Sequence, residues 1–348
     1  MKPGDRVING DVQGVDRSPK DQVDELLPYM DMVPVTGGMI DGYGSEGVFV
    51  QDRQVQLSPF LIAQYETTYA LWYWVRIWAQ HEGYSFTNRG KEGSSDNEGE
   101  PTVTQYEPVS SINWRDAVVW CNAYSELMGV LPEYTYQGEV IRNSNDILSC
   151  NHAEMRMGKG YRLPTEAEWE FAARGGNPAQ KGWDYSYPGI NLKEGLGSVA
   201  WYRENGEGTT HPVGNKNPNL LGLYDMGGNV WEWCWDWYHR LVWYQEENPP
   251  DPQAGFDPLQ ITGEWHWDRE WYKDIIPRDQ DNPCGALVGA SRVKRGGGWN
   301  SLESQVKVTY RGSSIPACTS RSIGFRVACS NGLWIEPHTE PRGTYEPS

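Results

Sequence analysis

The chain has 348 residues and a formal net charge of −17, which disfavours nucleic acid as a partner because nucleic-acid binding needs a basic patch. Its length suits one large domain or two small ones, and no apolar run reaches the ~18 residues expected of a membrane span. Abundant glycine and proline favour loops over helices, and 18 tryptophans with 20 tyrosines suit either an irregular core or a binding surface.

The N-terminal half alternates short apolar runs with polar stretches. Residues 1–30 are polar, and we expect them to form an arm outside the domain. Beyond this arm the pattern predicts, in chain order, strands at 48–50 and 55–65, a tryptophan-rich helix at 69–80, a polar loop at 86–104 and a helix at 113–128.

A third helix is predicted to begin at Thr165. Thr165 and Glu168 have the spacing of a capping box, in which each side chain binds an amide at the start of a helix. Pro164 blocks helix on the N-terminal side, and residues 167–172 supply an apolar face. We interpret this helix as structural, because nothing on it is catalytic chemistry.

Residues 231–237 (WEWCWDW) alternate tryptophan or cysteine with an acid at Glu232 and Asp236, which predicts a strand. The tryptophan side is expected to be buried, and the acidic side to face a polar or cationic partner. Residues 240–291 then form a long insertion rich in tryptophan. We expect it to be ordered and to pack beside residues 295–297.

The cysteines and histidines show no metal-binding or redox spacing. None of the six cysteines forms a CxxC pair, which disfavours zinc-knuckle and thioredoxin-like chemistry, and Cys121 and Cys234 lie in apolar runs where we expect buried thiols. The six histidines are scattered without an HxxxH or HExxH pattern, so a histidine metal centre is not expected.

Four segments resemble, in order and spacing, the formylglycine-generating enzyme (sulfatase-modifying factor) family. They are residues 160–174 (GYRLPTEAEWEFAAR), 222–234 (GLYDMGGNVWEWC), 295–297 (RGG) and 323–327 (IGFRV). The resemblance covers about residues 31–330. It implies an α+β fold of the C-type-lectin-like type, loop-rich with short strands and few helices, followed by a tail at 331–348.

The resemblance also implies that the catalytic centre has been lost. The family carries two reactive cysteines after the Arg-Gly-Gly run, and Ser301 and Val306 stand at those positions. Its enzymes also often bridge the Cys121 position to a residue of the fourth segment, where this chain has Val327. We therefore expect no enzymatic activity and no catalytic cofactor.

Within the family, residues 292–330 resemble the variable region of diversity-generating-retroelement proteins, in which scattered positions are diversified on a fixed frame. We expect Trp299 and Tyr310 to be frame residues, whose side chains point inward or lie beneath the variable surface. The mixed positions are expected to bind the ligand, and their side chains, at all but the two glycines, to point to solvent on one surface, rimmed by aromatic residues of the insertion. They are Gly298, Ser301, Leu302, Ser304, Gly312, Ser313, Ser314, Ile315, Ala317, Cys318, Ser320 and Ser322.

The family resemblance further implies a structural calcium site. Carried over, its ligands are the carboxylates of Asp225 and Glu232 and the carbonyls of Gly228 and Val230. Hard oxygen donors close together in sequence suit calcium. The alternative is a turn held by a salt bridge or by water.

Three functions are consistent with the fold that the resemblance implies. The first is a non-catalytic display protein that binds a protein or glycan ligand on another cell or host surface. The second is a copper-dependent thiol oxidase of the formylglycine type, which would need a thiolate pair, and the third is an iron-dependent enzyme, which would need clustered His and carboxylate ligands. The sequence favours the first.

The polar start MKPGD shows no export signal, which fits a cytoplasmic protein or a mature chain whose signal has been removed. The resemblance to displayed proteins favours the cell surface or the extracellular space. We expect a monomer that meets a membrane only through a possible lipid anchor outside this chain.

Overall fold

The computed structural model describes residues 18–42, 46–50, 53–238, 280–285 and 289–330. Its helices are α1 (Pro19–Leu26), α2 (Tyr69–His81), α3 (Trp114–Leu127), α4 (Ile147–Asn151) and α5 (Glu166–Ala173), with 3-10 turns η1 (Leu27–Met30), η2 (Lys193–Ser198) and η3 (Glu303–Val306). No helix in these ranges is long and apolar enough to cross a membrane.

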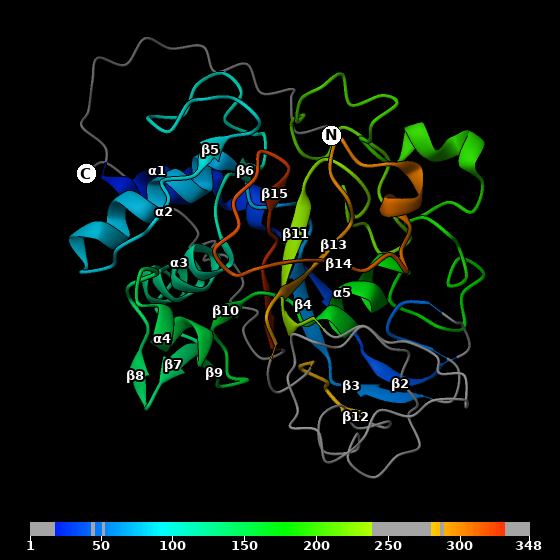
Figure 1. Cartoon of the computed structure of the whole chain (residues 1–348), viewed down its shortest axis with the longest axis horizontal. Coiled ribbons are helices and arrows are strands. Elements are labelled where there is room, and N and C mark those ends of the chain that lie inside the picture. The colour runs from blue at the N-terminus through cyan, green and yellow to red at the C-terminus, as the bar shows by residue number, and fades with distance from the viewer. Residues whose placement is uncertain (1–17, 43–45, 51–52, 239–279, 286–288, 331–348) are drawn as a thin grey trace, which may run out of the picture.

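Two four-stranded sheets form the centre of the molecule (Figure 1). In spatial order, one contains β1 (Met32–Val35), β4 (Phe60–Ala63), β16 (Ala328–Ser330) and β10 (Tyr161–Arg162), and the other contains β14 (Gly312–Ser314), β13 (Arg292–Arg295), β11 (Trp231–Trp237) and β15 (Ile323–Gly324).

Three smaller sheets lie around this centre. They are β12 (Gln280–Asp281), β3 (Gln54–Leu57) and β2 (Gly38–Asp41); β5 (Lys91–Glu92) and β6 (Val109–Ser110); and β8 (Glu139–Val140), β7 (Tyr134–Tyr136) and β9 (Glu154–Met155). Short strands, few helices and long connections confirm the predicted α+β class.

Strand β11 separates two hydrophobic clusters, as its alternating sequence predicts. Its tryptophans Trp231, Trp233 and Trp235 belong to the cluster built on α2 and α3, whereas Cys234 belongs to the cluster built on α5 and the β3–β4 region. The tryptophan side is buried as expected. The acidic side is buried too, because α5 covers it, and Trp169 on α5 donates its indole N–H to Glu232 at 2.7 Å.

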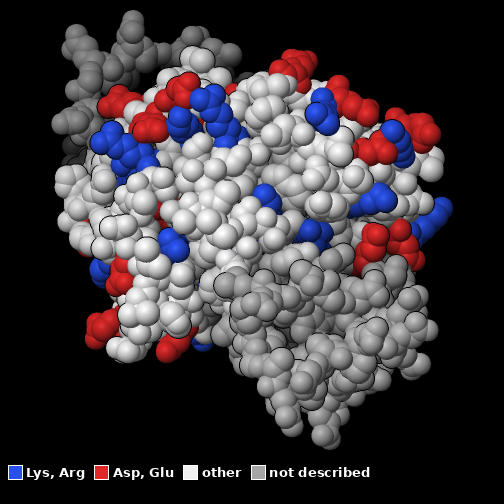
Figure 2. All heavy atoms as spheres, viewed as in Figure 1, with Lys and Arg blue, Asp and Glu red and all other residues white. Residues whose placement is uncertain are grey.

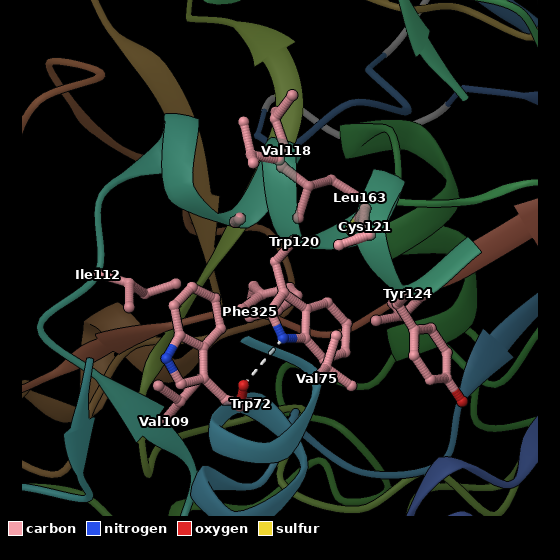
Figure 3. Close-up of a cluster of buried hydrophobic side chains, with 14 of the residues drawn as sticks. Trp72, Val75, Val109, Ile112, Val118, Trp120, Cys121, Tyr124, Leu163 and Phe325 are labelled. Carbon is pink, nitrogen blue, oxygen red and sulfur yellow. Dashed lines mark hydrogen bonds between the residues drawn. The ribbon is translucent and has the colours of Figure 1, made fainter. Parts of the chain in front are cut away.

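Aromatic packing holds α2, α3 and the C-terminal segment together (Figure 3). The indoles of Trp72 and Trp120 stack with their ring centroids 6.0 Å apart, and Phe325 meets both rings edge-on. Trp120 Nε1 also donates to the Trp72 carbonyl at 3.2 Å. Such aromatic pairs add to the stability given by burial alone, so the last family segment is anchored in the core.

The predicted helices are confirmed, each with a side-chain cap. Thr68 caps α2 and Asn113 caps α3, and Thr165 forms the expected capping box with Glu168. The predicted polar loop at 86–104 is interrupted by the two-residue strand β5, and both Cys121 and Cys234 are fully buried thiols, as expected.

Two predictions on the N-terminal strands need correction. The expected strand at 55–65 is two strands, β3 and β4, because Pro59 has no N–H for a ladder. Residues 46–49 are bends, not part of a strand, and the Val48 N–H donates to Glu170 of α5 at 2.8 Å.

The expected N-terminal arm is also wrong for its second half. Residues 18–30 contain α1 and η1, and α1 packs against α2 with Val23 and Leu26 buried. A capping box between Ser18 and Asp21 starts this helix. Most residues of the segment are polar, and only Val23 and Leu26 contact the core, so the sequence alone predicts a solvent-exposed segment.

Candidate functional site

Ser301 and Val306, the positions at which the family resemblance implies reactive cysteines, both lie inside the fold. Ser301 is 3% exposed, and its hydroxyl accepts the Gly298 N–H at 2.9 Å while its own N–H donates to the Gly298 carbonyl at 2.8 Å. Val306 is fully buried among Leu196, Val199 and their neighbours. A hydroxyl that closes a turn and a methyl pair in a core supply no thiol chemistry.

The segment from 298 to 322 carries the candidate binding residues, and their exposure differs. Gly298, Ser301 and Ser322 are buried, and for Ser301 and Ser322 this corrects the expectation that their side chains face solvent. The exposed members are Leu302, Ser304, Ile315 and Ala317, and the half-buried members are Gly312, Ser313, Ser314, Cys318 and Ser320.

The half-buried members on β14 do not share one face of the sheet. In the antiparallel register, Gly312 pairs with Lys294, Ser313 with Val293 and Ser314 with Arg292. Successive side chains of a strand point to opposite faces. Ser313 therefore lies on the face of Val293, and Ser314 on the face of Arg292, so the expectation of a single surface is wrong for this pair.

Three arginines tie the segment to its surroundings, Arg295 and Arg311 from inside and Arg321 at the surface. Arg295 donates to the carbonyls of Val308 and Tyr310 at 2.7 and 2.9 Å, and Arg311 donates to Glu166 at the start of α5. Arg321 binds Asp96 at 2.6 Å. Side chains inside the segment and on α5 and the 86–104 loop thus fix the shape on which the exposed residues sit.

The expected frame residues support the same surface. Trp299 is half-exposed and donates its indole N–H to the Arg321 carbonyl at 3.2 Å, which ties the two ends of the segment together. Tyr310 packs against Trp231 with their ring centroids 5.9 Å apart. The expected aromatic rim falls mostly on residues 239–279 and 286–288, outside the described residues.

A network of buried charges lies beneath the segment. Glu166 and Glu170 of α5 receive Arg311 and Arg295, and Asp236 of β11 accepts the Glu166 N–H at 2.7 Å. Burial works to raise the pKa of Glu166, but Arg311 and Arg295 hold that pKa below its ordinary value. Burial, with Glu166 adding repulsion, raises the pKa of Asp236 to about 7.

Of the four expected calcium ligands, Glu232 does not fit a calcium site, because its carboxylate already binds other side chains. Both oxygens of Glu232 are used by Arg326, at 2.7 and 2.8 Å, and one of them also by Trp169. One Asp225 oxygen accepts the Gly214 N–H at 2.7 Å, the other is buried without a hydrogen-bond partner, and burial raises the pKa of Asp225 to about 6.

The surroundings support this reading. Among the described residues, no group of three or more His, Cys, Asp or Glu side chains could hold a metal ion. Gly228, at φ +87°, makes a close approach in which a Cβ would lie 2.0 Å from the Trp201 carbonyl oxygen. The positive charge beside Glu232 comes from Arg326, which the sequence interpretation left without a role.

Sequence reasoning also passed over Lys294 on β13. Its ammonium lies 4.9 Å from the centroid of the Trp231 ring, and its side chain is half-buried. Burial lowers the pKa of Lys294, and the nearby Cys318 opposes that shift. Lys294 pairs directly with Trp233 across β13 and β11, which places it on the tryptophan face of the sheet, and no local pattern in residues 292–295 marks it.

The structure resembles solved proteins over most of its length. It matches Treponema denticola variable protein 1 with a TM-score of 0.64 at 28% identity, covering 86% of this chain and 95% of that one. It matches the crystal structure of CarF with a TM-score of 0.62 at 26% identity, covering 87% and 99%. Both the predicted C-type-lectin-like fold and the predicted resemblance to variable proteins are confirmed.

The sequence matches curated relatives more partially. Chaperone protein LppX of Paenibacillus barcinonensis is 34% identical over 229 residues, covering 60% of this chain and 72% of that protein. The formylglycine-generating enzyme of Streptomyces coelicolor is 34% identical over 178 residues, which cover 49% of this chain and 46% of the enzyme. Residues 18–331 match the sulfatase-modifying factor enzyme 1-like domain, and the chain belongs to that family.

Proposed function

We propose that this chain is a non-catalytic binding protein that presents a ligand-recognition surface on residues 298–322. The observation that carries the proposal is the contrast within this segment. Ser301 and Val306 are buried and chemically inert where the family's enzymes have reactive cysteines, while Leu302, Ser304, Ile315 and Ala317 are exposed. The likeness to a variable protein supports a binding role.

The fixed backbone of the segment suits this role. Arg295, Arg311 and Arg321 hold it through carbonyls and carboxylates rather than through the exposed side chains. Preorganised loops lose less conformational freedom on binding, and exposed positions usually change stability by less than about 0.5 kcal/mol. The surface can therefore change its ligand without changing the fold.

Further parts of the proposal concern how the surface is diversified, where the chain acts and what it binds. We infer that a retroelement diversifies the exposed positions, that the chain acts at the cell surface or outside the cell, and that its ligand is a protein or a glycan. The likeness to the variable protein motivates each part. We further propose that the chain binds as a monomer.

A binding comparison with a matched control tests the surface. The variant Leu302→Ser/Ser304→Ala/Ile315→Thr/Ala317→Ser changes the exposed side chains, and Leu131→Ser/Ile147→Thr/Leu148→Ser changes exposed residues elsewhere. On arrays of immobilised glycans and proteins, the first variant is expected to lose the wild-type ligands and the second to keep them. Both are expected to keep Tm within a few degrees. Ligand binding that survives in the first variant would contradict the proposal.

The alternative function is oxidation of a cysteine in a peptide, as in the formylglycine-generating relatives. All six cysteines lie in the described residues as free thiols, and none stands at 301 or 306. We expect no aldehyde when a cysteine-containing sulfatase peptide is incubated with the chain, copper and oxygen. Turnover in that assay would favour the enzyme.

A further inference from the structure

The charge balance of residues 298–322 is opposite to that of the whole chain. The chain carries −17, but this segment contains the basic residues Lys307, Arg311 and Arg321 and a single acid, Glu303. Glu303 is paired with Lys193, Arg311 with Glu166 and Arg321 with Asp96. Figure 2 shows a largely uncharged field in the middle of this face, with a few separate basic groups in it.

Lys294 sits at the centre of the sheet under this field. A row of cross-strand neighbours runs from Trp233 on β11 through Lys294 on β13 to Gly312 on β14. Trp233 is fully buried, whereas Lys294 and Gly312 are half-buried. The row thus leads from buried β11 to β14, which is the edge strand of this sheet among the described residues.

The ammonium of Lys294 is held by an aromatic ring and not by an acid. Its 4.9 Å distance to the Trp231 centroid lies within the usual range of a cation–π contact. Among the described residues, no carboxylate lies within salt-bridge distance of it. Burying a charge without a partner costs free energy, and the lowered pKa of Lys294 reflects the same cost. A carboxylate brought by a ligand would offset this cost.

Gly312 leaves the space that the Lys294 side chain and the Trp231 ring occupy. A Cβ at this position would lie 2.6 Å from the Trp231 ring and 3.1 Å from Lys294 Cγ, so any side chain there would have to displace one of them. The same position was expected to be one of the freely variable sites. Its glycine leaves the strand edge beside Lys294 open to a ligand.

We propose that Lys294 is the docking point for a carboxylate of an acidic peptide segment in a protein partner. The inference rests on the proposed binding function and names its ligand class. A peptide is favoured over an acidic saccharide because the Trp231 ring is buried under Lys294 and offers no open plane for a sugar. The exposed Ile315 and Ala317 follow β14 directly and give apolar contacts to neighbouring peptide side chains.

The test measures the binding of two labelled peptides of equal length, one alternating Glu with Ala and one alternating Gln with Ala, by fluorescence anisotropy. The wild-type chain is expected to bind the Glu peptide saturably, more weakly as salt rises, and not to bind the Gln peptide. Lys294→Gln is expected to weaken binding at least tenfold. The control Lys159→Gln removes the same charge from an exposed site elsewhere and is expected to stay within twofold.

Two further variants separate charge from geometry. Gly312→Ala is expected to weaken binding without any change of charge, and Lys294→Arg to retain part of the affinity. Equal losses in Lys294→Gln and Lys159→Gln would overturn the inference, since only net charge would then matter. Binding of an oligogalacturonate in place of the Glu peptide would overturn it in favour of an acidic saccharide.

The result also distinguishes this inference from the function beneath it. If array ligands are lost in the Leu302/Ser304/Ile315/Ala317 variant but the Glu peptide never binds, the carboxylate inference is wrong and the binding function stands. The other case is that Lys294→Gln abolishes binding of the Glu peptide while neither it nor the exposed-residue variant changes binding to the arrayed glycans and proteins. In that case the carboxylate site exists, but it is not the surface that binds those ligands.

Discussion

Arg326 donates hydrogen bonds to both carboxylate oxygens of Glu232, with Nη2–Oε1 at 2.7 Å and Nε–Oε2 at 2.8 Å. Both side chains are fully buried. The same guanidinium donates to the carbonyls of Ala63 and Tyr224 at 3.0 and 2.8 Å. One side chain thus joins β11, β4 and the loop before β11. The two family segments that carry Glu232 and Arg326 meet in this contact.

Removing Arg326 is expected to destabilise the chain strongly. Arg326→Met leaves the Glu232 charge buried without its partner, which typically costs about 3–5 kcal/mol. The measurement is the free energy of unfolding from urea denaturation, with Lys159→Gln as a surface control expected to stay near wild type. If Glu232→Gln/Arg326→Met recovers part of the loss, the cause is the unpaired charge rather than lost packing. A loss below about 1 kcal/mol would contradict the prediction.

Chelation of calcium is expected to leave stability unchanged. The geometry around Glu232 leads to this expectation, because Arg326 and Trp169 use the carboxylate that a calcium ion would need. Tm measured with EDTA and with added calcium should agree within about a degree, since binding to the folded state alone would raise Tm with ligand concentration. A clear rise of Tm with calcium would restore the site implied by the family resemblance.

Asp236 is expected to make stability fall as pH rises. Its pKa is about 7 in the folded chain against an ordinary 3.8, so the folded state binds the proton more tightly. The contribution is fully present below about pH 4 and is lost as pH rises toward 7. Asp236→Asn should therefore gain stability over the wild type between pH 5 and 8, by about 1 kcal/mol or more. The free energy of unfolding at several pH values measures this, and two parallel profiles would contradict it.

Natural variation is expected to follow burial. Across isolates, positions 302, 304, 315 and 317 should differ, while Gly298, Ser301 and Ser322 should not, because each of these three is buried. Gly312 should also stay fixed, since a Cβ there meets Trp231. Sequencing residues 292–330 from several isolates tests this. Frequent large side chains at 301 or 312 would show that the segment adapts more than its packing suggests.

Local signals in the sequence were sufficient for helices α2, α3 and α5 and for strand β11. The Thr165–Glu168 capping box and the tryptophan alternation depend on neighbours a few residues away, so the sequence contains all that they require. The prediction that reactive cysteines are absent likewise depends only on which residues stand at 301 and 306.

Contacts between distant segments could not be predicted in this way. Arg326 and Glu232 are 94 residues apart in the sequence, and no local pattern around either residue predicts that they form an ion pair. In the sequence Ser301 resembles the other small, variable residues, but in the structure its hydroxyl accepts the Gly298 N–H and closes the turn. Burial of such groups depends on what other elements bring to them, and that information is spread over the whole chain.

The pleat of β14 limits how this segment can acquire new sequences. Ser313 and Ser314 lie on opposite faces of the sheet because they are adjacent in a strand. One residue inserted or deleted ahead of them would exchange the two faces and send each side chain into the other's surroundings. Insertions and deletions would therefore change which side chains face the surface. New sequences can keep the surface only if residues are replaced without a change in length.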